Sequence, residues 1–147
     1  MGVAEAIREA EALLPGIPTD EGQDPRWQAI IEVSEYIWSG PEAAVEAVWG
    51  FTLRWGVYPQ EDLRTAIATC LLEHLLEHHF AAFFPRIEEL AMADPLFGDT
   101  FERCWQLGQA LEPGNAERYT ALSERLAAHM QAERGAAADD GRDIGLA

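Results

Sequence analysis

The sequence contains no lysine. All ten basic residues are arginine, 26 residues are acidic, and the formal net charge is −16. The lack of lysine excludes a Schiff base, a P-loop lysine and a lysine general base. The excess of negative charge disfavours binding to nucleic-acid phosphates or to an anionic membrane surface. It favours a basic protein partner, which long-range attraction would bring in faster. Solubility alone is the other explanation for so large a charge.

Cysteine and long apolar runs are scarce as well. Cys70 and Cys104 lie in apolar, helix-like segments, which is typical of buried free thiols. No apolar run approaches the roughly 18 to 20 residues of a membrane span. The segment 1–14 carries acidic residues where a secretion signal carries basic ones. We therefore expect a soluble, cytoplasmic protein.

The common catalytic patterns are also missing from the sequence. It has no GxSxG, no GxGxxG, no P-loop and no CxxC, which are short signatures of hydrolase, dinucleotide, nucleotide and redox sites. We therefore expect no enzymatic activity.

The sequence is rich in helix signals. Apolar spacing and the positions of proline, glycine and capping residues predict helices over 3–14, 25–38, 41–55, 59–79, 86–93, 96–110 and 116–134. Asp24-Pro25 and Asp94-Pro95 each combine an N-cap with a proline at the first helical position. Pro85 predicts a new helix start, and the segment 15–24 predicts a loop.

These signals predict one all-α domain over residues 1–134. No stretch alternates with period two for long enough to indicate a strand. We expect a compact irregular bundle of about six to seven helices. The alternative is a solenoid-like array of stacked helical hairpins, because the two Asp-Pro pairs recur 70 residues apart. The small, polar tail 135–147 is expected to be disordered.

Residues 71–80 read LLEHLLEHHF and contain His74-x-x-Glu77-His78, which matches the signature of one class of zinc proteases. In steps of 100° per residue, His74, Glu77 and His78 share a largely apolar face with Cys70, which predicts a central, buried helix.

One interpretation of this face is a site for zinc or another divalent metal, with His74, Glu77 and His78 as ligands and Cys70 nearby. A further ligand would come from another helix, where the candidates are Cys104, His129 or a carboxylate. The other interpretation is packing, with the histidines hydrogen-bonded to carboxylates or to the backbone. A protease would need a larger α/β fold and a glutamate far downstream, so catalysis is disfavoured.

The five tryptophans lie at helical spacing among aliphatic residues, at positions 27, 38, 49, 55 and 105. This spacing predicts that most of them belong to the core. One or two exposed tryptophans would mark an interface, because indole groups are frequent binding anchors.

The stretch 41–108 contains PEAAVEAVW, DLRTAIATCLLEHLLEHH, FPRIEELAMADPLF and FERCWQLG in that order. It resembles a mostly bacterial family of small, all-helical proteins known only as a domain of unknown function. Shared elements are a proline-acid-Trp helix with Trp49, an L-E-x-L-L-x-x-H helix, an I-E-x-L-A-x-x-D-x-x-F segment and a final aromatic helix with Trp105. The resemblance implies an all-α fold, a bacterial origin and no particular activity. Its matching polar positions are Glu73 and His79, which favours a structural role for the histidine-rich helix.

The sequence as a whole predicts a non-enzymatic, acidic protein-interaction module of the immunity, antitoxin or adaptor type, which binds a basic protein partner. The alternative is a metal-binding helical protein that uses His74, Glu77 and His78. Homo-oligomers are compatible with either function.

Overall fold

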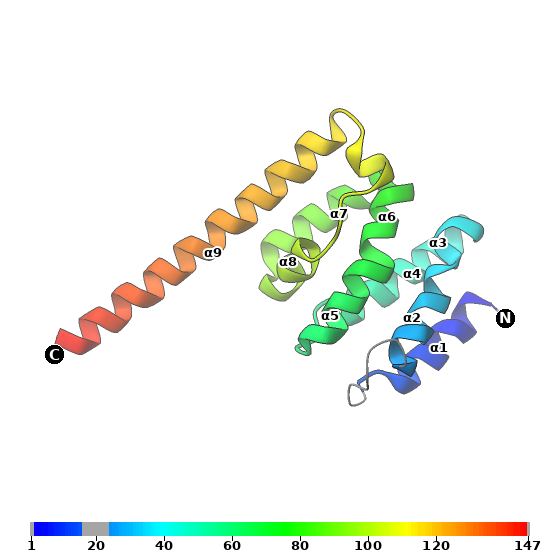
Figure 1. Cartoon of the computed structure of the whole chain (residues 1–147), viewed down its shortest axis with the longest axis horizontal. Helices are drawn as coiled ribbons and strands as arrows, with labels where there is room; N and C mark the ends of the chain where they lie inside the picture. Colours follow the sequence, from blue (N-terminus) through cyan, green and yellow to red (C-terminus); the bar gives the residue numbers. More distant parts are fainter. Residues whose placement is uncertain (1, 16–23, 147) are drawn as a thin grey trace.

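The computed structural model describes residues 2–15 and 24–146, with side chains described up to residue 135. The predicted loop 15–24 falls mostly on residues outside these ranges. The described residues contain no strand, so the expected all-α class is confirmed, and none of their helices has the length and apolarity that a membrane crossing requires. The elements are α1 (Val3–Leu13), α2 (Pro25–Ser34), α3 (Tyr36–Ser39), α4 (Glu42–Trp55), α5 (Glu61–Ile67), the π turn η1 (Ala68–Leu72), α6 (Glu73–His78), α7 (Phe80–Ala93), α8 (Pro95–Glu102), the 3-10 turn η2 (Gly108–Leu111) and α9 (Asn115–Leu146) (Figure 1).

The centre of the fold is a continuous rod made of α5, η1 and α6. The rod contacts α2, α3, α4, α7, α8 and η2, so elements far apart in the sequence meet around it. In a solenoid, each repeat contacts only its neighbours. The fold is therefore the expected irregular bundle and not a stacked array of hairpins. The buried aliphatic side chains of the rod are Leu63, Ile67, Leu71, Leu72, Leu75 and Leu76.

A π turn interrupts the rod at η1, where the N–H of Glu73 bonds to the carbonyl of Ala68. Such a turn takes up one more residue than an α-helical turn, which rotates every later side chain by about 100° relative to an uninterrupted helix. The face of His74 and His78 is therefore less buried than its apolar pattern predicts. The leucines beside them face the core, whereas His74 is half-buried and His78 is exposed.

The two Asp-Pro helix starts are confirmed. The carboxylate of Asp24 accepts the N–H of Arg26 at 2.9 Å, and that of Asp94 accepts the N–H of Leu96 at 2.9 Å. Both carboxylates satisfy backbone donors that have no partner within their own helix.

The predicted helix start at Pro85 is wrong. α7 begins at Phe80, and Pro85 lies inside it on an exposed face. A proline at this point removes the hydrogen bond to the carbonyl of Ala81. Because Ala81 is also exposed, water can satisfy that carbonyl and the helix continues.

The break between α6 and α7 lies at His79, whose backbone leaves the helical region with φ −139° and ψ 46°. The side chain of Gln109 bridges the two helix ends. Its amide nitrogen donates to the carbonyl of His78 at 2.8 Å, and its amide oxygen accepts the N–H of Phe80 at 2.9 Å. The helix break at His79 therefore coincides with the hydrogen bonds from Gln109, which is distant in sequence, and not with the nearby Pro85.

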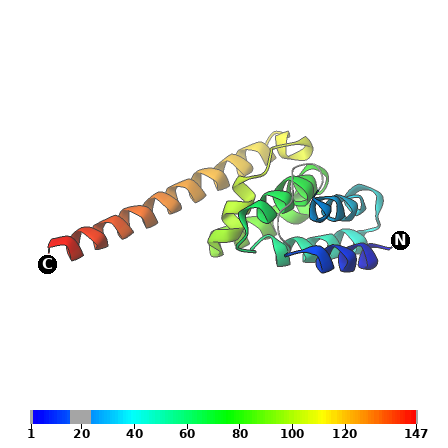
Figure 2. The same cartoon turned by 60° about the horizontal axis from the view of Figure 1, so that its bottom comes forward.

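The predicted helix over 96–110 is also shorter than expected. α8 ends at Glu102, and an irregular segment leads to η2. α9 begins at Asn115 as expected, and Leu126 is the last buried residue among those described. His129, Met130 and Glu133 still line a pocket with residues of α7 and α8. The C-terminal part of α9 projects from the bundle in both views (Figures 1 and 2). The helix runs through Leu146, so the expected boundary at residue 134 does not coincide with its end; disorder of the tail in solution stays a prediction.

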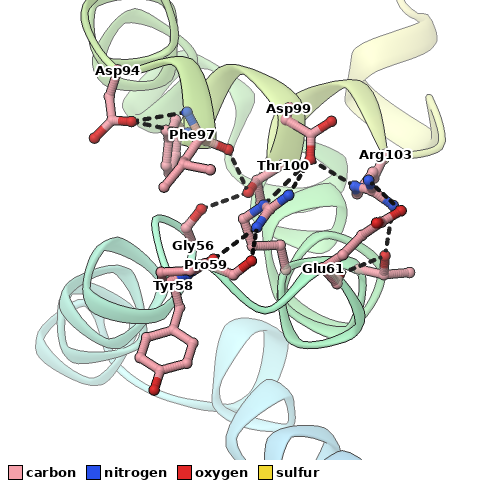
Figure 3. Close-up of polar contacts among 12 residues, drawn as sticks. Gly56, Tyr58, Pro59, Glu61, Asp94, Phe97, Asp99, Thr100 and Arg103 are labelled. Atoms are coloured by element: carbon pink, nitrogen blue, oxygen red, sulfur yellow. Dashed lines mark hydrogen bonds and ion pairs between the residues drawn. The ribbon is translucent and has the colours of Figure 1, made fainter. Parts of the chain in front are cut away.

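Ion pairs join α8 to α5, and hydrogen bonds join both helices to carbonyls of the α4–α5 connection (Figure 3). Arg64 is buried and donates to two carbonyls of that connection and to Asp99 at 2.8 Å. Arg103 donates to the same oxygen of Asp99 at 2.9 Å and to Glu61 at 2.9 Å. Burial alone would raise the pKa of Asp99, but the hydrogen bonds from Arg103 and Arg64 outweigh it and lower that pKa.

We expect Asp99→Asn to lower the free energy of unfolding by about 1–3 kcal/mol at neutral pH, because two guanidinium groups lose their shared charged acceptor. The lowered pKa of Asp99 adds stability above the pKa of the unfolded state. That contribution is lost as the pH falls through the folded-state pKa, so the variant and the wild type should converge in acid. Urea unfolding followed by tryptophan fluorescence measures both effects.

The matched control is Glu46→Gln, which breaks the exposed ion pair between Glu46 and Arg86. Such a surface pair contributes about 0–1 kcal/mol. Equal losses in the two variants would contradict the structural role of Asp99.

Candidate functional site

Trp38 and Trp105 are the two exposed tryptophans, and all five tryptophans lie in the described part of the chain. The exposed fraction is 55% for Trp38 and 72% for Trp105, whereas Trp49 is buried. Trp27 and Trp55 are half-buried against the core. The expectation that most tryptophans belong to the core and that one or two are exposed is therefore confirmed. The two exposed indoles identify the candidate site.

The histidine-rich helix α6 holds Trp38 in place. The ring of Trp38 lies 6.1 Å from the ring of His74 and 5.8 Å from that of His78, measured between ring centroids. His79 donates from Nε2 to the carbonyl of Ile37, the residue before Trp38, at 2.7 Å. Because a carbonyl only accepts hydrogen bonds, Nε2 of His79 carries the proton. The short helix α3 is thereby fixed to the end of α6.

Trp105 is held by a buried carboxylate of the same helix. Glu73 is 6% exposed, and its Oε2 accepts the N–H of Trp105 at 2.8 Å. The preceding residue, Cys104, bonds through Sγ to the carbonyl of Ala68 in the π turn. Burial raises the pKa of Glu73, and the Trp105 hydrogen bond and the nearby His74 offset part of this rise. A short irregular segment therefore presents its indole from a fixed backbone.

His74, Glu77 and His78 form a cluster on α6 beside the indole of Trp38. Nδ1 of His74 lies 2.8 Å and Nε2 of His78 lies 3.0 Å from the same oxygen, Oε1 of Glu77. Nε2 of His74 lies 3.7 Å from Oε1 of Glu73. His74 is hydrogen-bonded to Glu77, as in the packing interpretation, and His78 contacts the same carboxylate oxygen. We call Trp38, His74, Glu77, His78 and Trp105 the indole–histidine surface.

The other predicted metal ligands do not join this cluster. His129 lies on α9 and contacts Glu133 at 3.1 Å. Burial raises the pKa of Cys70 to about 11 and that of Cys104 well above its ordinary value, and both cysteines are free thiols. Protonated thiols are poor metal ligands. Among the described residues, no group of three or more histidine, cysteine or acidic side chains is arranged to hold a metal ion.

Gly108 supports the cluster from the segment that follows Trp105. Its φ is +52°, and a Cβ atom at this position would lie 2.6 Å from Cγ of Glu77 and 2.9 Å from the Glu77 carbonyl oxygen. Only glycine combines this backbone conformation with so close an approach. No local sequence pattern indicates this contact, because Gly108 and Glu77 are far apart along the chain.

We expect Gly108→Ala to lower the free energy of unfolding by about 1–3 kcal/mol, since the new methyl group forces Glu77 to move. Gly114→Ala is the matched control, because Gly114 also has a positive φ (+86°) but open space around it. Thermal unfolding followed by circular dichroism compares the two variants. If Gly114→Ala is equally destabilising, backbone strain alone explains the loss and the contact with Glu77 contributes nothing.

No family model, no curated protein and no solved structure matches this chain. The resemblance to an uncharacterised helical family therefore stays a prediction. The features of the molecule that bear on its function are the geometry and the charge of the indole–histidine surface.

Proposed function

We propose that the protein is a non-enzymatic interaction module, of the immunity, antitoxin or adaptor type, that binds a basic protein partner through the indole–histidine surface. The observation that carries this proposal is the presentation of Trp38 and Trp105. Both indoles are largely exposed, yet the backbone next to each is tied to α6 by a hydrogen bond. Exposed aromatic anchors held in a fixed geometry reduce the entropy cost of binding.

The charge of the chain supports a basic partner. Six of the described arginines already form ion pairs within the protein: Arg26, Arg54, Arg64, Arg86, Arg103 and Arg125. Because acidic residues outnumber basic ones by 26 to 10, the protein keeps a large negative charge after these pairs form. Long-range attraction then favours cationic partners and speeds their encounter.

Affinity capture from the native host tests this function. The wild-type chain and a Trp38→Ala/Trp105→Ala double variant are immobilised, and a recovered protein is then purified and titrated by calorimetry. We expect a basic protein that binds the wild type with a Kd on the order of micromolar or tighter and binds the double variant at least tenfold more weakly. Absence of any saturable protein partner would contradict the proposed function.

Metal binding is the second candidate function. The observation that favours it is the convergence of His74 and His78 on one oxygen of Glu77, since two imidazoles one helical turn apart can share one ion. A divalent ion such as zinc would replace the protons between these groups.

Elemental analysis of protein purified without a histidine tag tests the second candidate. It predicts stoichiometric zinc, a melting temperature that falls on chelation, and loss of both effects in His74→Gln/His78→Gln. His129→Gln is the matched control, because this histidine lies on α9 beside Glu133. Substoichiometric metal that leaves the melting temperature unchanged would contradict metal binding.

A further inference from the structure

The indole of Trp38 and the carboxylate of Glu77 are attached to the same two imidazoles. The rings of His74 and His78 contact Trp38 and also bind Oε1 of Glu77. Two imidazoles therefore link an exposed indole to a partly exposed carboxylate. The side chain of Glu77 keeps 26% of its area exposed.

Glu77 has room for another donor. A carboxylate offers about four lone-pair sites on its two oxygens. Two of these face the histidines at Oε1, and Oε2 takes part in no hydrogen bond or ion pair among the described residues. A ligand that donates hydrogen bonds can therefore bind Glu77 without displacing either histidine.

The guanidinium group is the donor that fits both neighbours. It is planar, always cationic, donates paired N–H groups to a carboxylate and stacks on aromatic faces. An ammonium group is a compact point charge and cannot do both with the same geometry. An anionic ligand would be repelled by Glu77 and by the net charge of −16.

The protein already contains this combination, filled by one of its own arginines. Both terminal nitrogens of Arg86 donate to the two oxygens of Glu46, at 2.8 and 2.9 Å. The same guanidinium lies 5.0 Å from the centre of the Phe83 ring. No ion pair or cation–π contact of the described arginines involves Trp38 or Glu77. The combination of Trp38 and Glu77 can therefore bind an arginine from another molecule.

We infer that an arginine side chain of the partner binds the indole–histidine surface, with its guanidinium paired to Glu77 and stacked on Trp38. The inference rests on the proposed function, because it names the group by which the basic partner is recognised. Trp105, whose backbone N–H binds Glu73 on the same helix, is the second exposed indole of the proposed surface.

A random peptide library displayed on phage and selected on the 147-residue chain tests the inference. We expect the enriched peptides to share an arginine. Replacing that arginine by lysine should weaken binding about tenfold, and replacing it by the neutral isostere citrulline should weaken it further.

Two variants of the protein locate the contact. Glu77→Gln keeps an oxygen that accepts the histidine hydrogen bonds and removes only the charge, and Trp38→Ala removes the indole. Each substitution should weaken the binding of the selected peptides at least tenfold. The matched controls are Glu112→Gln and Leu13→Ala, which change an exposed carboxylate and an exposed apolar side chain outside the surface and should leave the Kd unchanged.

Two other outcomes would overturn the inference. Enriched peptides without arginine, or full binding by Glu77→Gln and Trp38→Ala, would show that recognition uses another group or another face; a protein partner found by affinity capture would then still support the proposed function. If neither peptides nor a protein partner bind, the inference and the proposed function fail together.

Discussion

The π turn at Ala68–Leu72 determines which residues of the central rod meet solvent. It rotates α6 so that Leu75 and Leu76 fill the core while His74 and His78 reach the surface. Glu73, directly after this turn, is buried and binds the backbone of Trp105. The Ala68 carbonyl in this turn also accepts the Sγ–H of Cys104, so the turn anchors the start of the irregular segment as well. An uninterrupted helix would expose leucines and bury the polar cluster.

Local signals in the sequence were sufficient for most helix positions. Asp24 and Asp94 predicted two helix starts correctly, because capping depends on neighbouring residues alone. The prediction at Pro85 was wrong because the free-energy cost of a proline inside a helix depends on its surroundings. That cost is small where water can bind the carbonyl four residues earlier, and only the fold determines whether water reaches it. The helix break at His79 coincides with the Gln109 bridge, about thirty residues away, and no local pattern indicates it.

The candidate site was half predictable. The sequence placed His74, Glu77 and His78 together, since residues three and four apart share a helix face. It could not show that this face meets solvent, because a single additional residue in the preceding turn changes the orientation. The role of Trp105 was hidden for another reason. Its exposure depends on α8 ending at Glu102, and the helical spacing of its neighbours predicted a longer helix.

The projecting part of α9 has a mechanical consequence. Glu133 is the last residue of α9 that lines the pocket against α7 and α8, and thirteen residues follow it through Leu146, which corresponds to roughly 20 Å of helix at about 1.5 Å per residue. The indole–histidine surface is built from α3, α6 and the segment after α8, and it uses no residue of α9. A reporter or a surface linker attached at the C-terminal end of α9 would therefore lie at a distance from the bundle. A group attached at that end and a partner bound to α6 would occupy separate spaces.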